Sequence, residues 1–306
     1  MIYDCFTFYN EVELLILRLE LLHKKIDKFI IVEASKTFTG IPKPYNLEQN
    51  WDRLKKFHHK ILYIKIDDFP SMENPWICEN YQRNMISCGL NDCKDHDLIM
   101  ISDLDEIPDS QKIPKSVPDG IVKCFLQDNY YYFANNYISR NIVWEGGTKI
   151  LNYKTFSQNL LSEKYVKYNE ITFPQSLNAG NTPMKIRLYR NLDYIRDGGW
   201  HFGWLGGVDF IMNKLQSFSH QEHNNQYINN REYITNCLAT GKDLLDARNK
   251  CYVIDRSNFP EDIIRLMPPQ FFLDSKRRLN IFGYKFLKFK QISFIYTRNY
   301  LRKFFG

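Results

Sequence analysis

The N-terminal third of the chain alternates between short apolar runs and segments with helical spacing. Residues 2–8 are rich in aromatic and β-branched side chains, which predicts a first strand. In residues 11–23 apolar side chains recur every three or four positions, as in an amphipathic helix. Residues 28–33 form an apolar run typical of parallel strands buried on both faces. A strand, a helix and a strand in this order predict an α/β sheet.

The same alternation continues as far as the acidic sequence DLDEIP at Asp103–Pro108. Residues 35–45 contain one glycine and two prolines, so we predict a loop there. A strand at 61–66, a helix at 79–88 and a strand at 97–102 are predicted to follow. Because open α/β sheets bind ligands beyond the carboxyl ends of their strands, we expect a functional site in that crevice.

The second half of the chain has a different pattern. Residues 121–150 are aromatic and alternating, which predicts antiparallel strands that extend or cover the sheet. A short strand at 185–189 and a helix at 208–218 are also predicted, on either side of a segment rich in glycine and tryptophan at 198–207. We therefore expect one composite α/β domain over residues 1–274, followed by a basic, aromatic C-terminal extension over residues 275–306.

Composition narrows the class of protein. The chain has 306 residues, of which 44% are hydrophobic and 25% charged, which excludes disordered and fibrous proteins. The net charge is +6, but residues 275–306 hold nine basic residues and no acidic one. The rest of the chain is therefore slightly acidic, which argues against a nucleic-acid partner.

Cysteine usage and hydropathy suggest a compartment. The seven cysteines form no CxxC pair, which indicates free thiols in a reducing environment rather than disulfides or a zinc site. The N-terminal residues are acidic where a signal peptide would be basic, and no apolar run approaches the length of a transmembrane helix. We expect a cytoplasmic protein, with peripheral membrane contact through its tail as an open alternative.

The acidic sequence after the predicted strand at 97–102 is the first candidate site. Asp103 and Asp105 are one residue apart at the end of a strand, so both can reach one divalent cation and leave positions open for phosphate oxygens. The alternative is an acidic turn, because aspartate and proline are common in turns.

His201 is the candidate third ligand, because neutral imidazole complements two carboxylates at a metal. Trp200 beside it offers a flat apolar wall to a donor molecule. The alternative for His201 is a hydrogen-bonded histidine of the core. Further along, Glu222 lies between His220 and His223 and is a candidate general base, and the HxxH spacing is weak evidence for a metal.

Three further residues are candidates for donor binding. Arg83, on the predicted helix, can pair with a phosphate, although an arginine on a helix is more often solvated or in a surface ion pair. Glu33 ends the second strand and can accept a hydrogen bond from a ribose hydroxyl, and Thr37 lies in the loop that follows. The sequence has neither GxGxxG nor a P-loop, so dinucleotide-dependent hydride transfer and P-loop kinase chemistry are not supported.

Several of these segments, taken in order, resemble the family 17 glycosyltransferases. The resemblance lies in FYNEVELLILR, KFIIVEASKTFTGIPKP, WICENYQR, ISDLDEIP and GGWHFGW, at residues 8–18, 28–44, 76–83, 101–108 and 198–204. It implies a GT-A-like α/β fold, with a Rossmann-like mixed sheet flanked by helices. It also implies a nucleotide-sugar donor (UDP-GlcNAc in the characterised case), a Mn²⁺ or Mg²⁺ ion, and inversion at the anomeric carbon.

The resemblance also suggests residue roles. Asp103 and Asp105 match the acidic motif that holds the metal and the diphosphate, and His201 matches the histidine of the Gly-Trp-His segment. Glu33, Thr37 and Arg83 match motif positions that face the donor. Glu222 falls in the region where inverting GT-A enzymes place a carboxylate base.

The function expected from the sequence is a metal-dependent inverting glycosyltransferase. It would move a sugar, with GlcNAc from UDP-GlcNAc as the best candidate, onto a hydroxyl of a glycan, glycoprotein or glycolipid. Two alternatives stay open. One is a non-catalytic carbohydrate-binding protein, and the other is a metal-dependent nucleotide-sugar hydrolase or phosphotransferase.

The tail at 276–306 alternates basic residues with nine aromatic ones. One interpretation is a segment that lies on an anionic membrane surface. The other is a C-terminal helix or strand that packs its aromatic side chains on the domain while its lysines and arginines extend into water.

Overall fold

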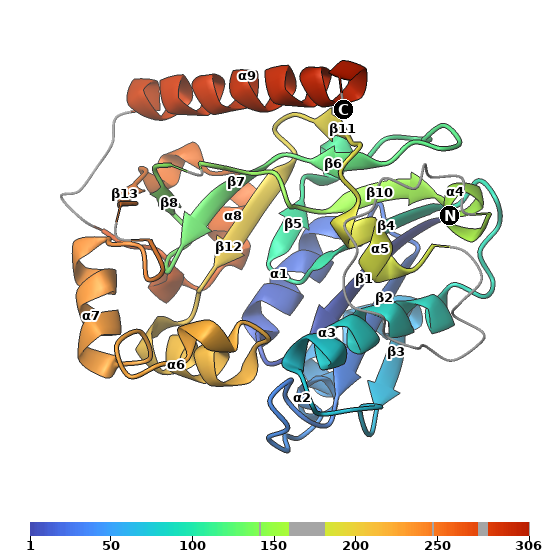
Figure 1. Cartoon of the computed structure of the whole chain (residues 1–306), viewed down its shortest axis with the longest axis horizontal. Helices are drawn as coiled ribbons and strands as arrows, with labels where there is room; N and C mark the ends of the chain where they lie inside the picture. The colour runs from blue at the N-terminus through green and yellow to red at the C-terminus, as the bar shows by residue number, and fades with distance from the viewer. Residues whose placement is uncertain (141, 159–180, 247, 275–280, 306) are drawn as a thin grey trace.

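Four parallel strands form one side of the larger sheet in a computed structural model that describes residues 1–140, 142–158, 181–246, 248–274 and 281–305. They are arranged in the order β3-β2-β1-β4 (Figure 1). Their bounds are Ile2–Phe8 for β1, Lys28–Ala34 for β2, Ile61–Ile66 for β3 and Leu98–Asp103 for β4. These are the four strands predicted from the first hundred residues.

Three shorter strands extend this sheet beyond β4. The antiparallel strand β10 (Lys149–Asn152) pairs with β4 and with β6 (Lys123–Phe125), and β11 (Asp193–Ile195) forms the edge. A second sheet has the order β13-β8-β7-β12-β5, with β9 paired to β7. Its strands are β5 (Glu106–Pro108), β7 (Gln127–Tyr131), β8 (Asn136–Ile138), β9 (Val143–Trp144), β12 (Gly199–Gly203) and β13 (Cys251–Val253). Two mixed sheets flanked by helices are consistent with the expected GT-A-like fold.

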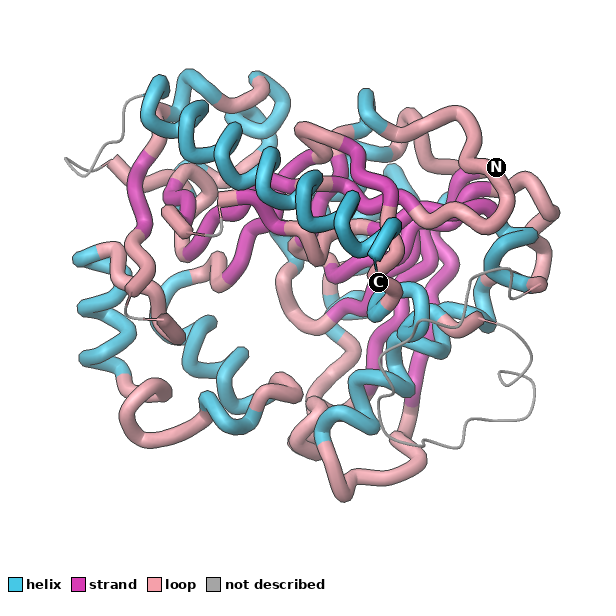
Figure 2. The backbone as a smooth tube through the Cα atoms, turned by 45° about the horizontal axis from the view of Figure 1, so that its top comes forward, coloured by secondary structure: helices cyan, strands magenta, loops and turns pink. Residues whose placement is uncertain are grey.

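Helices cover both sheets, as Figure 2 shows. Their bounds are Val12–Leu22 (α1), Asn46–Gln49 (α2), Pro75–Asn84 (α3), Tyr153–Ser157 (α4), Pro183–Leu188 (α5), Gly207–Ser217 (α6), Arg231–Thr240 (α7), Glu261–Leu266 (α8) and Ile281–Phe305 (α9). Within the described residues, no helix is both long and apolar enough to cross a membrane.

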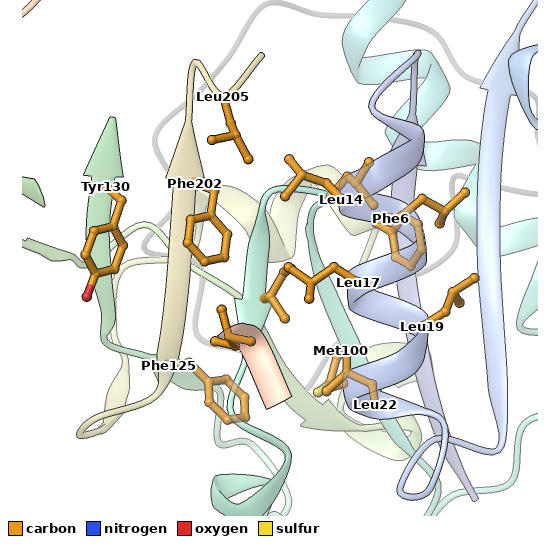
Figure 3. Packing of buried hydrophobic residues seen from close by; sticks show 14 of the residues in the cluster. Phe6, Leu14, Leu17, Leu19, Leu22, Met100, Phe125, Tyr130, Phe202 and Leu205 are labelled. Carbon is orange, nitrogen blue, oxygen red and sulfur yellow. The ribbon is translucent and has the colours of Figure 1, made fainter. Parts of the chain in front are cut away.

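Alternate residues of β1 point into two different hydrophobic cores. Phe6 packs with α1, β4 and residues of the second sheet (Figure 3). Cys5 instead faces the core on the side of α3. Leu14 and Leu17 of α1 lie between Phe6 and the strand that carries Phe202. The helical spacing predicted for residues 11–23 therefore joins the two sheets through one core.

Two predicted elements differ from the structure. Residues 183–188 form α5 instead of a strand, because Pro183 occupies the first helical turn and the Thr182 hydroxyl accepts a hydrogen bond from the Lys185 amide. The helix predicted from residue 79 begins at Pro75, where Asn74 caps it by accepting from the Trp76 amide. In both cases a capping residue followed by proline marks the start.

Within the tail, Ile281–Phe305 form one long helix, α9, that packs on the domain. Tyr284 and Ile295 of α9 are buried. Lys288 forms ion pairs of 2.7 Å with Asp128 and 2.8 Å with Asp197. Packing of the tail on the domain, one of the two interpretations of the sequence, is therefore observed, and the outward face of the helix is considered below.

Candidate active site

A cavity of about 790 Å³ opens beyond the carboxyl ends of β1 and β4, between α3, α5 and α6. Its charged lining residues come from elements throughout the chain: Glu11, Lys36, Lys43, Glu79, Arg83, Asp103, Asp105, Glu145, Arg187, Arg190, Lys214, Arg298 and Arg302. Cationic side chains outnumber carboxylates among them, which favours an anionic ligand. The position at the strand ends is the one expected for a ligand site in an α/β sheet.

Asp103 ends β4 and is held between two arginines. Its carboxylate lies 2.7 Å from the Arg83 guanidinium and 2.9 Å from that of Arg187. Burial alone would raise the pKa of Asp103, but the two guanidiniums outweigh burial and hold this pKa well below its ordinary value. Asp103 is therefore an anion that fixes two cations at the cavity wall.

Glu106, the third acid of the motif, is an internal anchor. Its carboxylate accepts two parallel hydrogen bonds from Arg187, of 2.5 and 2.7 Å, and a third of 2.7 Å from Trp144 Nε1. It also accepts from the Asp103 amide at 3.0 Å. The bidentate contact fixes the plane of the Arg187 guanidinium. Arg187 is not among the candidates predicted from the sequence, because residues 185–189 were expected to form a strand.

Asp105 lies next to a neutral imidazole. His201 Nε2 is 4.0 Å from the Asp105 carboxylate, and Nδ1 is 2.8 Å from the side-chain oxygen of Asn129. The ring stacks on Trp144, with 4.6 Å between centroids. Burial lowers the pKa of His201, and Asp105 opposes that effect. If Nδ1 donates to Asn129, Nε2 carries a lone pair on the side of Asp105.

Of the three predicted metal ligands, Asp103, Asp105 and His201, only the last two are placed to bind one divalent cation. A neutral imidazole nitrogen and a carboxylate 4.0 Å apart suit one Mn²⁺ or Mg²⁺ ion whose other positions are filled by water or phosphate. In the described residues Asp103 does not join them, because its oxygens are paired with arginines and no metal-sized group of three ligands includes it. The structure thus brings together two of the three predicted ligands.

Lys214 of α6 is the cation nearest to Asp105. Its ammonium lies 3.3 Å from the Asp105 carboxylate and 3.8 Å from Glu11. Burial would lower the pKa of Lys214, but these two carboxylates raise it overall. A charged lysine is therefore available beside Asp105, at a position that no sequence motif marked.

Arg18 fixes the backbone of residues 103–106, the acidic turn that follows β4, from the side of the hydrophobic core. This fully buried side chain on α1 pairs with the buried Asp4 through hydrogen bonds of 2.6 and 2.8 Å. Its Nη1 also donates to the backbone carbonyls of Asp103, Leu104 and Glu106, at 3.0, 3.2 and 2.9 Å. The position of Asp105 therefore depends on a buried ion pair outside the cavity.

The glycines around His201 allow two strands to approach closely. Gly199 has a φ of +125°, and a Cβ there would lie 2.2 Å from the carbonyl oxygen of Ile107 on β5. Any other residue would push β12 away from β5. The constraint that requires glycine at position 199 is therefore the packing of two strands.

Two of the predicted donor-binding residues lie outside the cavity lining. Glu33 is fully buried, and its carboxylate accepts from Lys43, Tyr63 and the Asn46 and Leu47 amides at the start of α2, at 2.6–3.0 Å. Trp200 packs on the hydrophobic core that contains Phe6 and Phe202. Successive side chains of a strand point to opposite faces, so Trp200 and His201 cannot both face the same side of β12. We therefore leave both out of the proposed donor site.

Arg83 and Thr37 do line the cavity. Arg83 is almost fully buried, and two of its nitrogens, Nε and Nη1, have no hydrogen-bond partner among the described residues. The Thr37 hydroxyl is 2.9 Å from that of Thr39 and accepts from the Ile41 amide. Arg83 thus has two buried donors without a partner in the described residues, whereas Thr37 orders the loop.

Glu222 lies at the exposed rim, outside the lining of the cavity. Its carboxylate is 2.6 Å from Nδ1 of His220, and this hydrogen bond lowers the pKa of Glu222. His220 itself lines the cavity and packs edge-on against Trp76. Ligand atoms of His220, Glu222 and His223 all lie within 4.8 Å of one another, so this rim can also hold a metal ion.

A buried lysine holds α5, and with it Arg187, in place. Lys149 of β10 is fully buried and its ammonium donates to the carbonyls of Ile186, Arg187 and Tyr189 at the end of α5. Burial lowers the pKa of Lys149 to about 7. The amine thus releases its proton more easily in the folded state than in the unfolded state.

Lys149 is expected to make stability rise with pH above neutrality. Between pH 7 and 8.5 the unfolded state binds more protons at this lysine than the folded state, so the free energy of unfolding increases, by roughly 1.5 kcal/mol from this group. Lys149→Met should lack this increase. Urea unfolding of both proteins at pH 7.0 and 8.5 measures the difference, and equal pH dependence in the two would contradict the assignment.

Comparisons with known proteins indicate the family of this chain. Residues 1–167 match the sequence profile of Glycosyltransferase family 17. Two curated relatives are each named β-1,4-mannosyl-glycoprotein 4-β-N-acetylglucosaminyltransferase. The Homo sapiens protein is 29% identical over 129 residues, and the Rattus norvegicus protein is 27% identical over 129 residues.

Each of these two matches covers 40% of this chain and only 23% or 22% of the relative, so the chain spans about a quarter of the length of the curated relatives it matches. The family match ends before α5, β12 and α6, so the contributions of Arg187, His201 and Lys214 to the site rest on geometry. It includes β1 to β4 and the acidic turn, and it extends over more than half of the chain. The chain belongs to glycosyltransferase family 17.

Proposed function

We propose that the protein transfers a sugar from a nucleotide-sugar donor to a hydroxyl of a glycan acceptor, with inversion at the anomeric carbon. UDP-GlcNAc is the first donor to test. The observation that carries the proposal is the cavity at the end of β4, where buried cations and the acidic turn of a family 17 glycosyltransferase meet. This combination suits a diphosphate, whose charge must be stabilised as it leaves the sugar.

Three cations are proposed to bind the donor diphosphate. Arg83 and Arg187 are held in fixed orientations by Asp103 and Glu106, so they need little reorganisation to meet phosphate oxygens. Lys214, beside Asp105, supplies a third positive charge. Preoriented charges of this kind stabilise the leaving nucleotide more strongly than water does.

A divalent cation, Mn²⁺ or Mg²⁺, is proposed to bind Asp105 and His201. When bound, it would neutralise negative charge on the diphosphate. Asp103 is assigned a different role from the one expected, because its carboxylate orients Arg83 and Arg187. Asn129 in turn fixes the His201 ring through Nδ1, as partners of metal-binding histidines commonly do.

Deprotonation of the acceptor hydroxyl is proposed to involve His220 together with Glu222. His220 lines the cavity, and its hydrogen bond to the Glu222 carboxylate at Nδ1 leaves Nε2 to accept a proton. Glu222 would then orient the imidazole and stabilise its charged form. This modifies the expectation from sequence that Glu222 itself removes the proton.

Turnover of a panel of UDP-, GDP- and dTDP-sugars, with and without Mn²⁺, tests the proposed function. Transfer to an added glycan, or slow hydrolysis of one donor in its absence, would support it. Release of inorganic phosphate instead of a nucleoside diphosphate would indicate a phosphotransferase or nucleotide hydrolase. Binding of glycans without consumption of any donor would favour a carbohydrate-binding protein.

A further inference from the structure

The outward face of α9 is unusually apolar for a surface helix. Phe286, Phe289, Phe294 and Tyr300 are each more than half exposed, and Leu301 is about half exposed. Their spacing places them on one side of the helix over four turns. Exposed Lys290, Ser293 and Thr297 lie on the same side, between these apolar residues. Scattered apolar side chains are normal at a protein surface, but several large ones along one helix face, such as this aromatic stripe, usually mark an interaction surface.

Contacts on the opposite side fix how α9 is rotated. Tyr284 donates a 2.6 Å hydrogen bond to Asp128, and Lys288 pairs with Asp128 and Asp197. The Gln291 side chain both accepts from and donates to the backbone of Val143. These buried polar contacts hold the aromatic stripe outward.

The charge on this face indicates its partner. Lys285 and Lys290 are exposed within the stripe, and residues 275–306 contain no acid. A second copy docked through the same face would bring the lysines of both copies together, which is unfavourable. An anionic lipid surface complements the charge and also accepts aromatic side chains at the level of its headgroups.

We propose that α9 docks the protein on an anionic membrane, with the helix axis parallel to the surface and the aromatic stripe in the headgroup region. The outer face carries both components that such docking requires, because its exposed aromatic side chains lie beside the exposed lysines Lys285 and Lys290. This inference does not depend on the proposed function.

Docking would leave the cavity directly behind α9, on the side of the helix that faces away from the lipid. Arg298 and Arg302, in the C-terminal half of α9, line the cavity, and Arg298 pairs there with Glu145. If the chain is a glycosyltransferase, as proposed above, an acceptor anchored in the membrane could reach the site from the side of α9. That consequence rests on the proposed function, whereas membrane binding can be measured without an assay of enzymatic activity.

Sedimentation with lipid vesicles tests the docking. The full chain is mixed with vesicles of phosphatidylcholine alone or with 30% phosphatidylglycerol, at 0.1 M and 0.5 M NaCl. We expect binding only to the anionic vesicles, and weaker binding at high salt because the charges are screened. Phe286→Ser/Phe289→Ser/Phe294→Ser should lower the partition coefficient about a thousandfold, since burial of each of the three phenylalanines is worth roughly a factor of ten.

Lys285→Gln/Lys290→Gln should lower the partition coefficient by about 25-fold, because each basic residue near an anionic surface contributes about a factor of five. Two variants far from α9 in sequence serve as controls with the same kinds of substitution. Ile41→Ser/Tyr227→Ser removes two other exposed apolar side chains, and Lys24→Gln/Lys25→Gln removes two other exposed charges. Neither control should change binding.

Three outcomes would overturn the proposal. The first is no binding to anionic vesicles by the folded wild-type chain. The second is equal loss of binding in the α9 variants and their controls. The third is a dimer, detected by light scattering, that is disrupted by the phenylalanine variant while vesicle binding is absent, because the stripe would then belong to a second copy.

Discussion

Asp105→Asn is expected to lower donor turnover about a thousandfold. Asparagine keeps the shape of the side chain but removes the charge that faces both His201 and Lys214. Loss of a divalent cation, or of its correct placement, removes several kcal/mol of stabilisation from the transition state, and about 4 kcal/mol corresponds to a thousandfold. Steady-state turnover of the donor in saturating Mn²⁺ measures the effect.

The fold of this variant should be unchanged. The Asp105 side chain is not part of the buried Arg18 network, and the backbone carbonyl that accepts from the Phe202 amide is retained. Asp92→Asn, at an exposed position outside the cavity, is the matched control and should retain full turnover. A folded Asp105→Asn protein with turnover within threefold of wild type would contradict the assignment of Asp105.

Metal titrations need a further variant, because the rim cluster at His220, Glu222 and His223 can also bind a cation. Glu222→Gln/His223→Ala removes two of its three ligands while keeping His220. If Mn²⁺ binding by calorimetry persists in this background and disappears when Asp105→Asn is added, the ion belongs to the Asp105 and His201 pair. Loss of binding in the rim variant alone would place the ion at the rim instead.

The sequence predicts the parallel half of the fold well. The buried strands β1, β2 and β4 are nearly continuous apolar runs, and the spacing in α1 is that of a helix with one buried face. The position of the acidic turn at the cavity follows from this pattern alone, because the carboxyl ends of parallel strands share one edge. Arg83 pairs with Asp103 there, and His201 lies 4.0 Å from Asp105 without lining the cavity itself.

Other site residues depend on contacts that no local pattern encodes. Glu33 and Asp103 both lie at the ends of parallel strands, yet Glu33 is satisfied by Lys43 and by the first amides of α2, whereas Asp103 faces the cavity. Only the course of the following loop decides between these outcomes. The sequence could have predicted that Trp200 points away from the site. Side chains alternate along a strand, so Trp200 and its neighbour His201 must lie on opposite faces of the sheet.

The largest stability effect is expected at Arg18, which links the core to the acidic turn. Arg18→Met leaves Asp4 charged and fully buried without its partner, and it removes the donor to three backbone carbonyls of the turn. Removal of one partner from a buried ion pair costs about 3–5 kcal/mol. Urea unfolding followed by circular dichroism should show a loss in this range.

A double variant separates the two contributions of Arg18. In Asp4→Leu/Arg18→Met the uncompensated charge is gone, so at least about 1 kcal/mol of the loss should be recovered, since apolar replacements of buried ion pairs are often tolerated. Full recovery is not expected, because the carbonyls of the turn stay without their donor. Arg53→Met, which breaks the exposed pair with Glu13, should cost less than about 1 kcal/mol. If Arg18→Met cost no more than this control, the acidic turn would have to be held by its own strand pairing, and Arg18 would have no structural part in positioning Asp105.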